Sequence, residues 1–129
     1  MVNVASNITE LTLVAGGSYA EREAWIATTL QNTPSYTDQK KIGVLLEGLP
    51  SGSMAMQSSS LLQIERIAPG CFCCIGQIAM RVSLNRLLRQ QLGHLFIAIN
   101  DERHLSSFHA SLNQAPYAEL INCRDIVSL

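Results

Sequence analysis

Short apolar runs alternate with segments of helical periodicity along the whole chain, and this alternation limits the folds that it can adopt. The runs Leu11 to Ala15, Lys41 to Leu46 and His94 to Ile99 are almost continuously apolar. Strands of this kind are typical of parallel sheets buried on both faces, whose connections are crossover helices. We therefore expect an α/β fold of three layers, a mostly parallel sheet with helices on both faces.

The period of each segment gives the order β-α-β-loop-β-α-β-α-β. The longest helical pattern, residues 75–92, ends just before Gly93, and glycine commonly follows a helix C-terminus. We therefore expect the next residue, His94, to complement the negative end of this helix dipole. We expect strands over 11–15, 41–46, 61–67, 94–99 and 119–127, and helices over 20–31, 75–92 and 105–113.

Composition excludes several classes of protein. The 129 residues suit one domain, 1–129, and the formal net charge of -1 argues against a nucleic-acid binder, which needs a clustered basic surface. No apolar run reaches the roughly 18 residues of a membrane-spanning helix. The first ten residues lack the basic and apolar regions of a signal peptide. We expect a cytoplasmic protein that does not enter membranes.

Three of the four cysteines lie together, as Cys71, Cys73 and Cys74 in the run GCFCC. Clustered thiols in an intracellular protein indicate metal or redox chemistry, and thiolates are good zinc ligands. Two or three sulfurs fall short of a closed tetrahedral site, so a further ligand would come from elsewhere. The alternatives are three small buried residues at a tight turn, or a reversible disulfide with Cys-x-x-Cys spacing. Cys123 is expected in the core of the last strand.

The run GCFCC, between a strand and a long helix, resembles the GCxCC element of the CobW-type metallochaperone GTPases, which are P-loop proteins. Leu11 to Ile26 lies where that family has its first strand, Walker A loop and helix. Lys41 to Leu49 resembles the second strand and the acidic loop, and Leu95 to His104 the strand that leads into a catalytic turn. The resemblance implies a truncated P-loop NTPase-like fold.

The nucleotide-binding motifs depart from that family. A working P-loop reads G-x-x-x-x-G-K-[ST], so that backbone N–H groups cradle phosphates. Gly16 keeps the first glycine, but Glu21, Arg22 and Glu23 replace the last three motif residues. Asn100-Asp101 stands where the catalytic turn of that family carries Ser/Thr-Gly. We expect a pseudo-GTPase that is not an enzyme and binds no nucleotide, with Arg22 as a solvated helix residue.

In the resembled family the later cysteines hold the metal with help from the acidic loop. Cys73 and Cys74 match those cysteines, and Glu47 is the nearby carboxylate; its alternative is a solvated residue at a strand end. His104, near the expected catalytic turn, is a more distant ligand candidate.

The resulting hypothesis is a Zn²⁺- or Co²⁺-binding protein for metal storage, delivery or sensing. Release would require ligand exchange with a metal-receiving or regulatory partner protein, or thiol oxidation. A homodimer would cover an exposed edge of the sheet. The alternatives are a thiol redox protein, with a measurable reduction potential and no tight metal, and a non-catalytic interaction scaffold in which the cysteines are dispensable.

Overall fold

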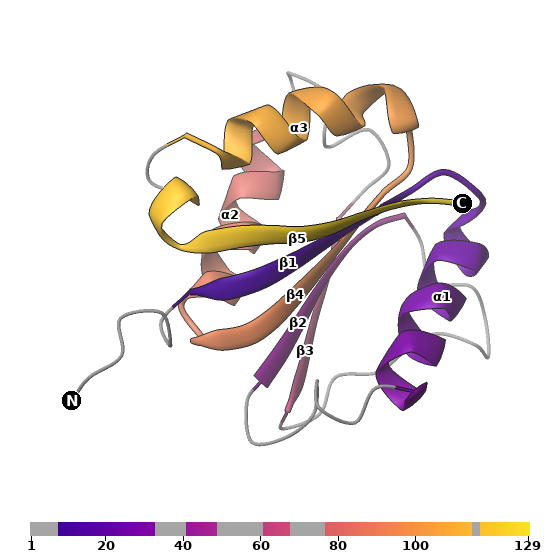
Figure 1. Cartoon of the computed structure of the whole chain (residues 1–129), viewed down its shortest axis with the longest axis horizontal. Coiled ribbons are helices and arrows are strands. Elements are labelled where there is room, and N and C mark those ends of the chain that lie inside the picture. Colours follow the sequence, from indigo (N-terminus) through magenta and orange to yellow (C-terminus); the bar gives the residue numbers. More distant parts are fainter. Residues whose placement is uncertain (1–7, 33–40, 49–60, 68–76, 115–116) are drawn as a thin grey trace.

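A five-stranded parallel sheet forms the centre of the protein (Figure 1). The computed structural model describes residues 8–32, 41–48, 61–67, 77–114 and 117–129. The strand order is β3-β2-β4-β1-β5, and every neighbouring pair is parallel. The strands are β1 (Thr9–Ala15), β2 (Lys41–Glu47), β3 (Leu62–Ile67), β4 (Leu92–Ile99) and β5 (Ile121–Ser128).

Helices cover both faces of this sheet, which confirms the expected three-layer α/β fold. Figure 1 shows α1 (Tyr19–Asn32) on one face and both α2 (Gln77–Leu88) and α3 (Leu105–Leu112) on the other. Two short 3-10 turns, η4 (Glu102–His104) and η5 (Tyr117–Glu119), flank α3 in the chain. None of the helices in these described ranges is long and apolar enough to cross a bilayer.

Side-chain alternation along the strands divides the core into two apolar clusters. The larger cluster lies on the α2 and α3 face, and the smaller lies under α1, because successive strand residues point to opposite faces. On β1, for example, Leu13 belongs to the larger cluster and Val14 to the smaller. Phe96 lies in the smaller cluster, where the Trp25 ring of α1 packs edge-on against it with a centroid distance of 6.4 Å.

The expected end of the long helix is wrong. The helix ends at Leu88, and Gln91, with a φ of 57°, makes the left-handed residue of the turn. Gly93 lies inside β4, because Leu92 is already a strand residue: it is buried, it pairs with Lys41, and its carbonyl accepts the Thr9 hydroxyl at 2.9 Å. Strand pairing here overrides the local preference of glycine for a helix end.

His94 is a core residue, and the expected helix-terminal role is wrong. Its side chain is 3% exposed and shares a 2.8 Å hydrogen bond with the hydroxyl of Thr12 on the neighbouring strand. Its ring lies 4.5 Å from that of Phe96, centroid to centroid. Burial lowers the pKa of His94 to about 4, and the nearby Arg124 acts in the same direction.

We expect His94 to make the protein less stable in acid. Its folded pKa of about 4 lies below the ordinary 6.5, so the unfolded chain binds more protons between these values. The free energy of unfolding should therefore fall, by about 2 kcal/mol, as the pH drops from 7 to 4. Urea unfolding at several pH values measures this fall, which His94→Gln should remove.

His109, on α3, provides the matched control. The variant His109→Gln should keep the steep acid dependence of the native chain. A His94→Gln variant with that same steep dependence would contradict the assignment to His94.

Candidate functional site

Polar and charged side chains gather at the carboxyl edge of the sheet, where parallel α/β proteins bind their ligands. Gly16 and Gly17 follow β1, Glu47 is the last residue of β2, and Asn100 follows β4. These segments are far apart in sequence, and they meet because β1 and β2 both pair with β4.

Arg22 lies buried at the centre of this edge, so its expected role as a solvated helix residue is wrong. It is 1% exposed, and its Nη1 donates to the carbonyl oxygens of Gly16 and Gly17, both at 2.8 Å. Its Nη2 donates to Asn100 Oδ1 at 3.0 Å. The Tyr19 ring lies 5.2 Å from the guanidinium carbon, within cation–π range.

Burial lowers the pKa of Arg22, while the nearby Glu47 carboxylate opposes that shift. A guanidinium stays protonated in proteins, so this edge holds a permanent buried cation. The cation faces the chain's own carbonyl, amide and carboxylate oxygens, which compensate for its lost hydration.

The N-terminus of α1 is capped by its own side chains. The Ser18 Oγ accepts the N–H of Glu21 at 3.1 Å, and the Glu21 Oε1 accepts the N–H of Ser18 at 2.8 Å. This reciprocal pair is a capping box. Helix N-termini bind phosphates through unsatisfied N–H groups and the positive end of the helix dipole. Here a carboxylate of the chain already occupies that position.

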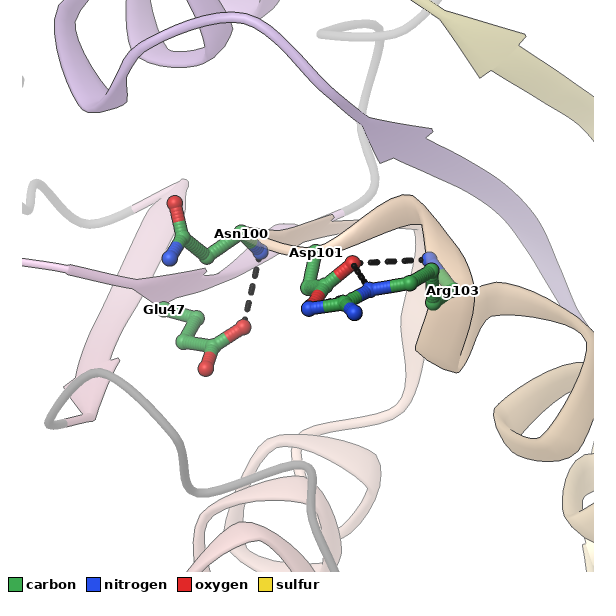
Figure 2. A network of polar contacts seen from close by, with 4 residues as sticks. All are labelled: Glu47, Asn100, Asp101 and Arg103. Atoms are coloured by element: carbon green, nitrogen blue, oxygen red, sulfur yellow. Dashed lines mark hydrogen bonds and ion pairs between the residues drawn. The ribbon is translucent and has the colours of Figure 1, made fainter.

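Glu47 is also buried, so the alternative of a solvated strand-end residue is wrong. It is 3% exposed, and its Oε1 accepts the backbone N–H of Asn100 at 2.7 Å, as Figure 2 shows. The following Gly48 has a φ of 139°, and a Cβ there would collide with the Tyr19 ring. The end of β2 is thus packed tightly against α1 and against the exit from β4.

An ion pair between the buried Glu23 and the partly exposed Arg66 was not predicted from the sequence. The Arg66 guanidinium donates to both carboxylate oxygens of Glu23, at 3.0 and 3.1 Å, which ties α1 to β3. The Glu23 side chain is 4% exposed and that of Arg66 is 22% exposed. Both residues line a small hollow with Arg22 and Glu47. No local sequence pattern predicts such a pair, because the two residues are 43 positions apart.

The exit from β4 contains a second, solvent-facing pair. The Asp101 carboxylate accepts hydrogen bonds from the Arg103 backbone N–H at 2.9 Å, from Nε at 3.1 Å and from Nη2 at 2.7 Å (Figure 2). These bonds lower the pKa of Asp101 to about 2. Asp101 therefore stays ionised and serves to shape the turn before α3.

The predicted cysteine ligands Cys71, Cys73 and Cys74 lie outside the described residues. Cys123 lies on β5, half-buried against the larger apolar cluster, and burial raises the pKa of its thiol. A thiol of this kind is less reactive than an ordinary one at neutral pH. Within the described residues, no group of three or more His, Cys, Asp or Glu side chains could hold a metal ion.

Comparisons with known proteins give no relative. No family model, no curated protein and no solved structure matches the chain.

Replacing Arg22 tests whether it holds the carboxyl edge together. Arg22→Met should lower the free energy of unfolding by about 3 kcal/mol, because it removes the three hydrogen bonds of a buried guanidinium and the cation beside Glu47. Urea unfolding followed by circular dichroism measures the change. The exposed Arg81 of α2 is the control, and Arg81→Met should cost less than about 0.5 kcal/mol. Equal small losses in both variants would contradict this role.

Proposed function

We propose that the protein binds a transition-metal ion, Zn²⁺ or Co²⁺, through Cys71, Cys73 and Cys74, for metal storage, delivery or sensing. The observation that carries the proposal is the GCFCC run in the connection from β3 to α2. Clustered thiolates are strong ligands for these ions. The metal is cargo, and release depends on ligand exchange with a metal-receiving or regulatory protein or on thiol oxidation.

One end of the connection that carries this run, Ile67, lies beside Glu47. Ile67 ends β3 at the carboxyl edge and pairs in register with Glu47 of β2. Cys71 follows Ile67 by four residues, which span at most about 14 Å. Cys74 precedes Gln77, where α2 begins, by three residues.

Glu47 remains in the proposal as a carboxylate ligand of secondary importance. Its Oε1 already accepts the Asn100 N–H, and the Arg22 cation lies close enough to interact with it. A cation already present beside a carboxylate weakens its attraction for a metal ion. We therefore assign most of the affinity to the cysteines.

The geometry at α1 supports a function without nucleotide. In the resembled family a Walker A loop would bind phosphates at this place. Here Ser18 and Glu21 cap the helix, and the Arg22 side chain bonds the loop carbonyls. A phosphate approaching this helix end would meet the Glu21 carboxylate. We therefore propose a pseudo-GTPase that is not an enzyme, acting in the cytoplasm, where thiols stay reduced.

An anaerobic metal titration of the reduced protein against a competing chelator tests this function. The chain should bind Zn²⁺ and Co²⁺ stoichiometrically, and the Co²⁺ form should show thiolate charge-transfer absorption. The double variant Cys73→Ala/Cys74→Ala should lose roughly a hundredfold or more in affinity, since changes in outer-sphere contacts alone cost 10–100-fold.

Cys123 supplies the matched control. Cys123→Ala, which changes a thiol on β5, should bind metal like the native chain. Weak binding, or binding that the double variant leaves unchanged, would contradict the metal proposal. The thiol redox and scaffold functions would then be separated by measuring a reduction potential.

We also propose that the protein acts as a homodimer joined along β5. Among the described residues, this strand lies at one end of the strand order, and no strand pairs with its outer backbone groups. Its Ile126 side chain is 49% exposed. Pairing with a second copy would cover both the apolar side chain and the strand edge.

Light scattering tests the dimer, and the expected mass is twice that of one chain. Ile126→Lys should yield a monomer, because a lysine on an edge strand opposes pairing. Val82→Lys is the control, since Val82 on α2 is equally exposed, at 51%, and its replacement should leave the dimer intact. A monomeric native protein would contradict the dimer.

A further inference from the structure

The β5 strand carries one residue more than the stretch of β1 that it pairs with. Leu11 of β1 pairs with Cys123, and the next β1 residue, Thr12, pairs with Asp125, so Arg124 has no β1 residue opposite it. Two residues of one strand that oppose a single residue of its neighbour form a β-bulge. The bulge lies at Arg124 and Asp125, which are the two middle residues of β5.

The bulge changes which face of the sheet the side chains of β5 occupy. In a regular strand, residues four positions apart face the same side. Cys123, however, packs against the larger apolar cluster on the α2 and α3 face, whereas Val127 packs against the smaller cluster under α1. Alternation counted forward from Cys123 and backward from Val127 places both Arg124 and Asp125 on the α1 face.

His94 supports this placement of the two charges. Its ring packs against that of Phe96, which belongs to the smaller cluster under α1. Besides burial, which is the main cause of the shift, Arg124 lowers the pKa of His94 and Asp125 raises it. Arg124 and Asp125 are both exposed, and neither forms an ion pair with another described residue. An edge strand therefore presents a positive and a negative side chain next to each other on one face.

A second copy of the chain presents the complementary arrangement. Two identical edge strands related by a two-fold axis perpendicular to the sheet are antiparallel, and whenever residue i faces residue j, residue j faces residue i. Residues directly opposite each other in an antiparallel pair point to the same face of the sheet. Two consecutive residues of a regular strand cannot meet this condition, because they point to opposite faces. The bulge allows Arg124 and Asp125 to meet it.

We propose that β5 pairs antiparallel with β5 of a second copy, in the register that sets Arg124 of each chain opposite Asp125 of the other. Two reciprocal ion pairs then flank the two-fold axis. A shift of one residue in either direction would set Arg124 opposite Arg124 or Asp125 opposite Asp125, and like charges directly opposite each other destabilise a strand pair. This inference rests on the proposed homodimer.

The other residues of β5 fit the same register. Cys123 lies opposite Ile126, and both belong to the α2 and α3 face, because Ile126 pairs with Leu13 of the larger cluster. Asn122 lies opposite Val127, and both belong to the α1 face by alternation from Cys123 and by packing, respectively. Because the two-fold axis passes through the middle of the strand, the register pairs β5 over its whole length.

Charge-reversal variants and their mixture test this register. Arg124→Glu alone and Asp125→Arg alone should each weaken dimerisation roughly a hundredfold or more and give a monomer by light scattering, because each sets like charges opposite each other. An equimolar mixture of the two variants should form a heterodimer, since every pair then joins opposite charges. The double variant Arg124→Glu/Asp125→Arg should dimerise like the native chain.

Arg81→Glu, on the exposed face of α2, is the control and should leave the dimer intact. A monomeric native chain would overturn both the homodimer and this register. Dimers that persist in both single variants, or a mixture that stays monomeric, would overturn the register and leave the homodimer standing. A mixture that dimerises shows that both variants are folded and supports the register.

Discussion

The buried Arg22 guanidinium holds together the segments that meet at the carboxyl edge of the sheet. Its hydrogen bonds join α1 to the Gly16–Gly17 loop and to Asn100 at the exit from β4. Glu47 extends the network to β2 by accepting the Asn100 N–H. A cation this deeply buried is stable only while its donors are satisfied, so the loops are fixed together. The edge where α/β proteins usually bind ligands is thus partly filled by the chain itself.

The carboxyl edge therefore has two parts with different chemistry. At β1 and α1, the Glu21 carboxylate accepts the N–H of Ser18 at the helix N-terminus, and the Arg22 guanidinium donates to the carbonyl oxygens of Gly16 and Gly17. On the α2 and α3 face, the described residues leave a buried imidazole nitrogen without a partner at His104. Ile67, which ends β3, and Met80, in the first turn of α2, pack on that face. The proposed metal function therefore does not depend on Glu21 or Arg22.

The layers could be predicted from the sequence because each strand and helix carries its own period. The continuously apolar run Leu95 to Ile99, for example, predicts a strand buried on both faces. In the structure it belongs to β4, which pairs with β1 on one side and β2 on the other. The errors at Gly93 and His94 arose where strand pairing outweighed a local helix-end signal. The burial of Arg22 and Glu47 was not predicted, because it depends on segments that meet only in the folded sheet, and no local sequence pattern indicates it. The cysteine site, by contrast, could be proposed from the sequence, because Cys71, Cys73 and Cys74 are neighbours along the chain.

Zinc K-edge X-ray absorption of the reduced, zinc-loaded protein tests the central claim most directly, because it reports the atoms bound to the metal. We expect two or three sulfur neighbours at about 2.3 Å, with lighter nitrogen or oxygen neighbours at about 2.0–2.2 Å completing the coordination. A first shell made only of nitrogen and oxygen would contradict the account, since the cysteine run would then not be the metal site.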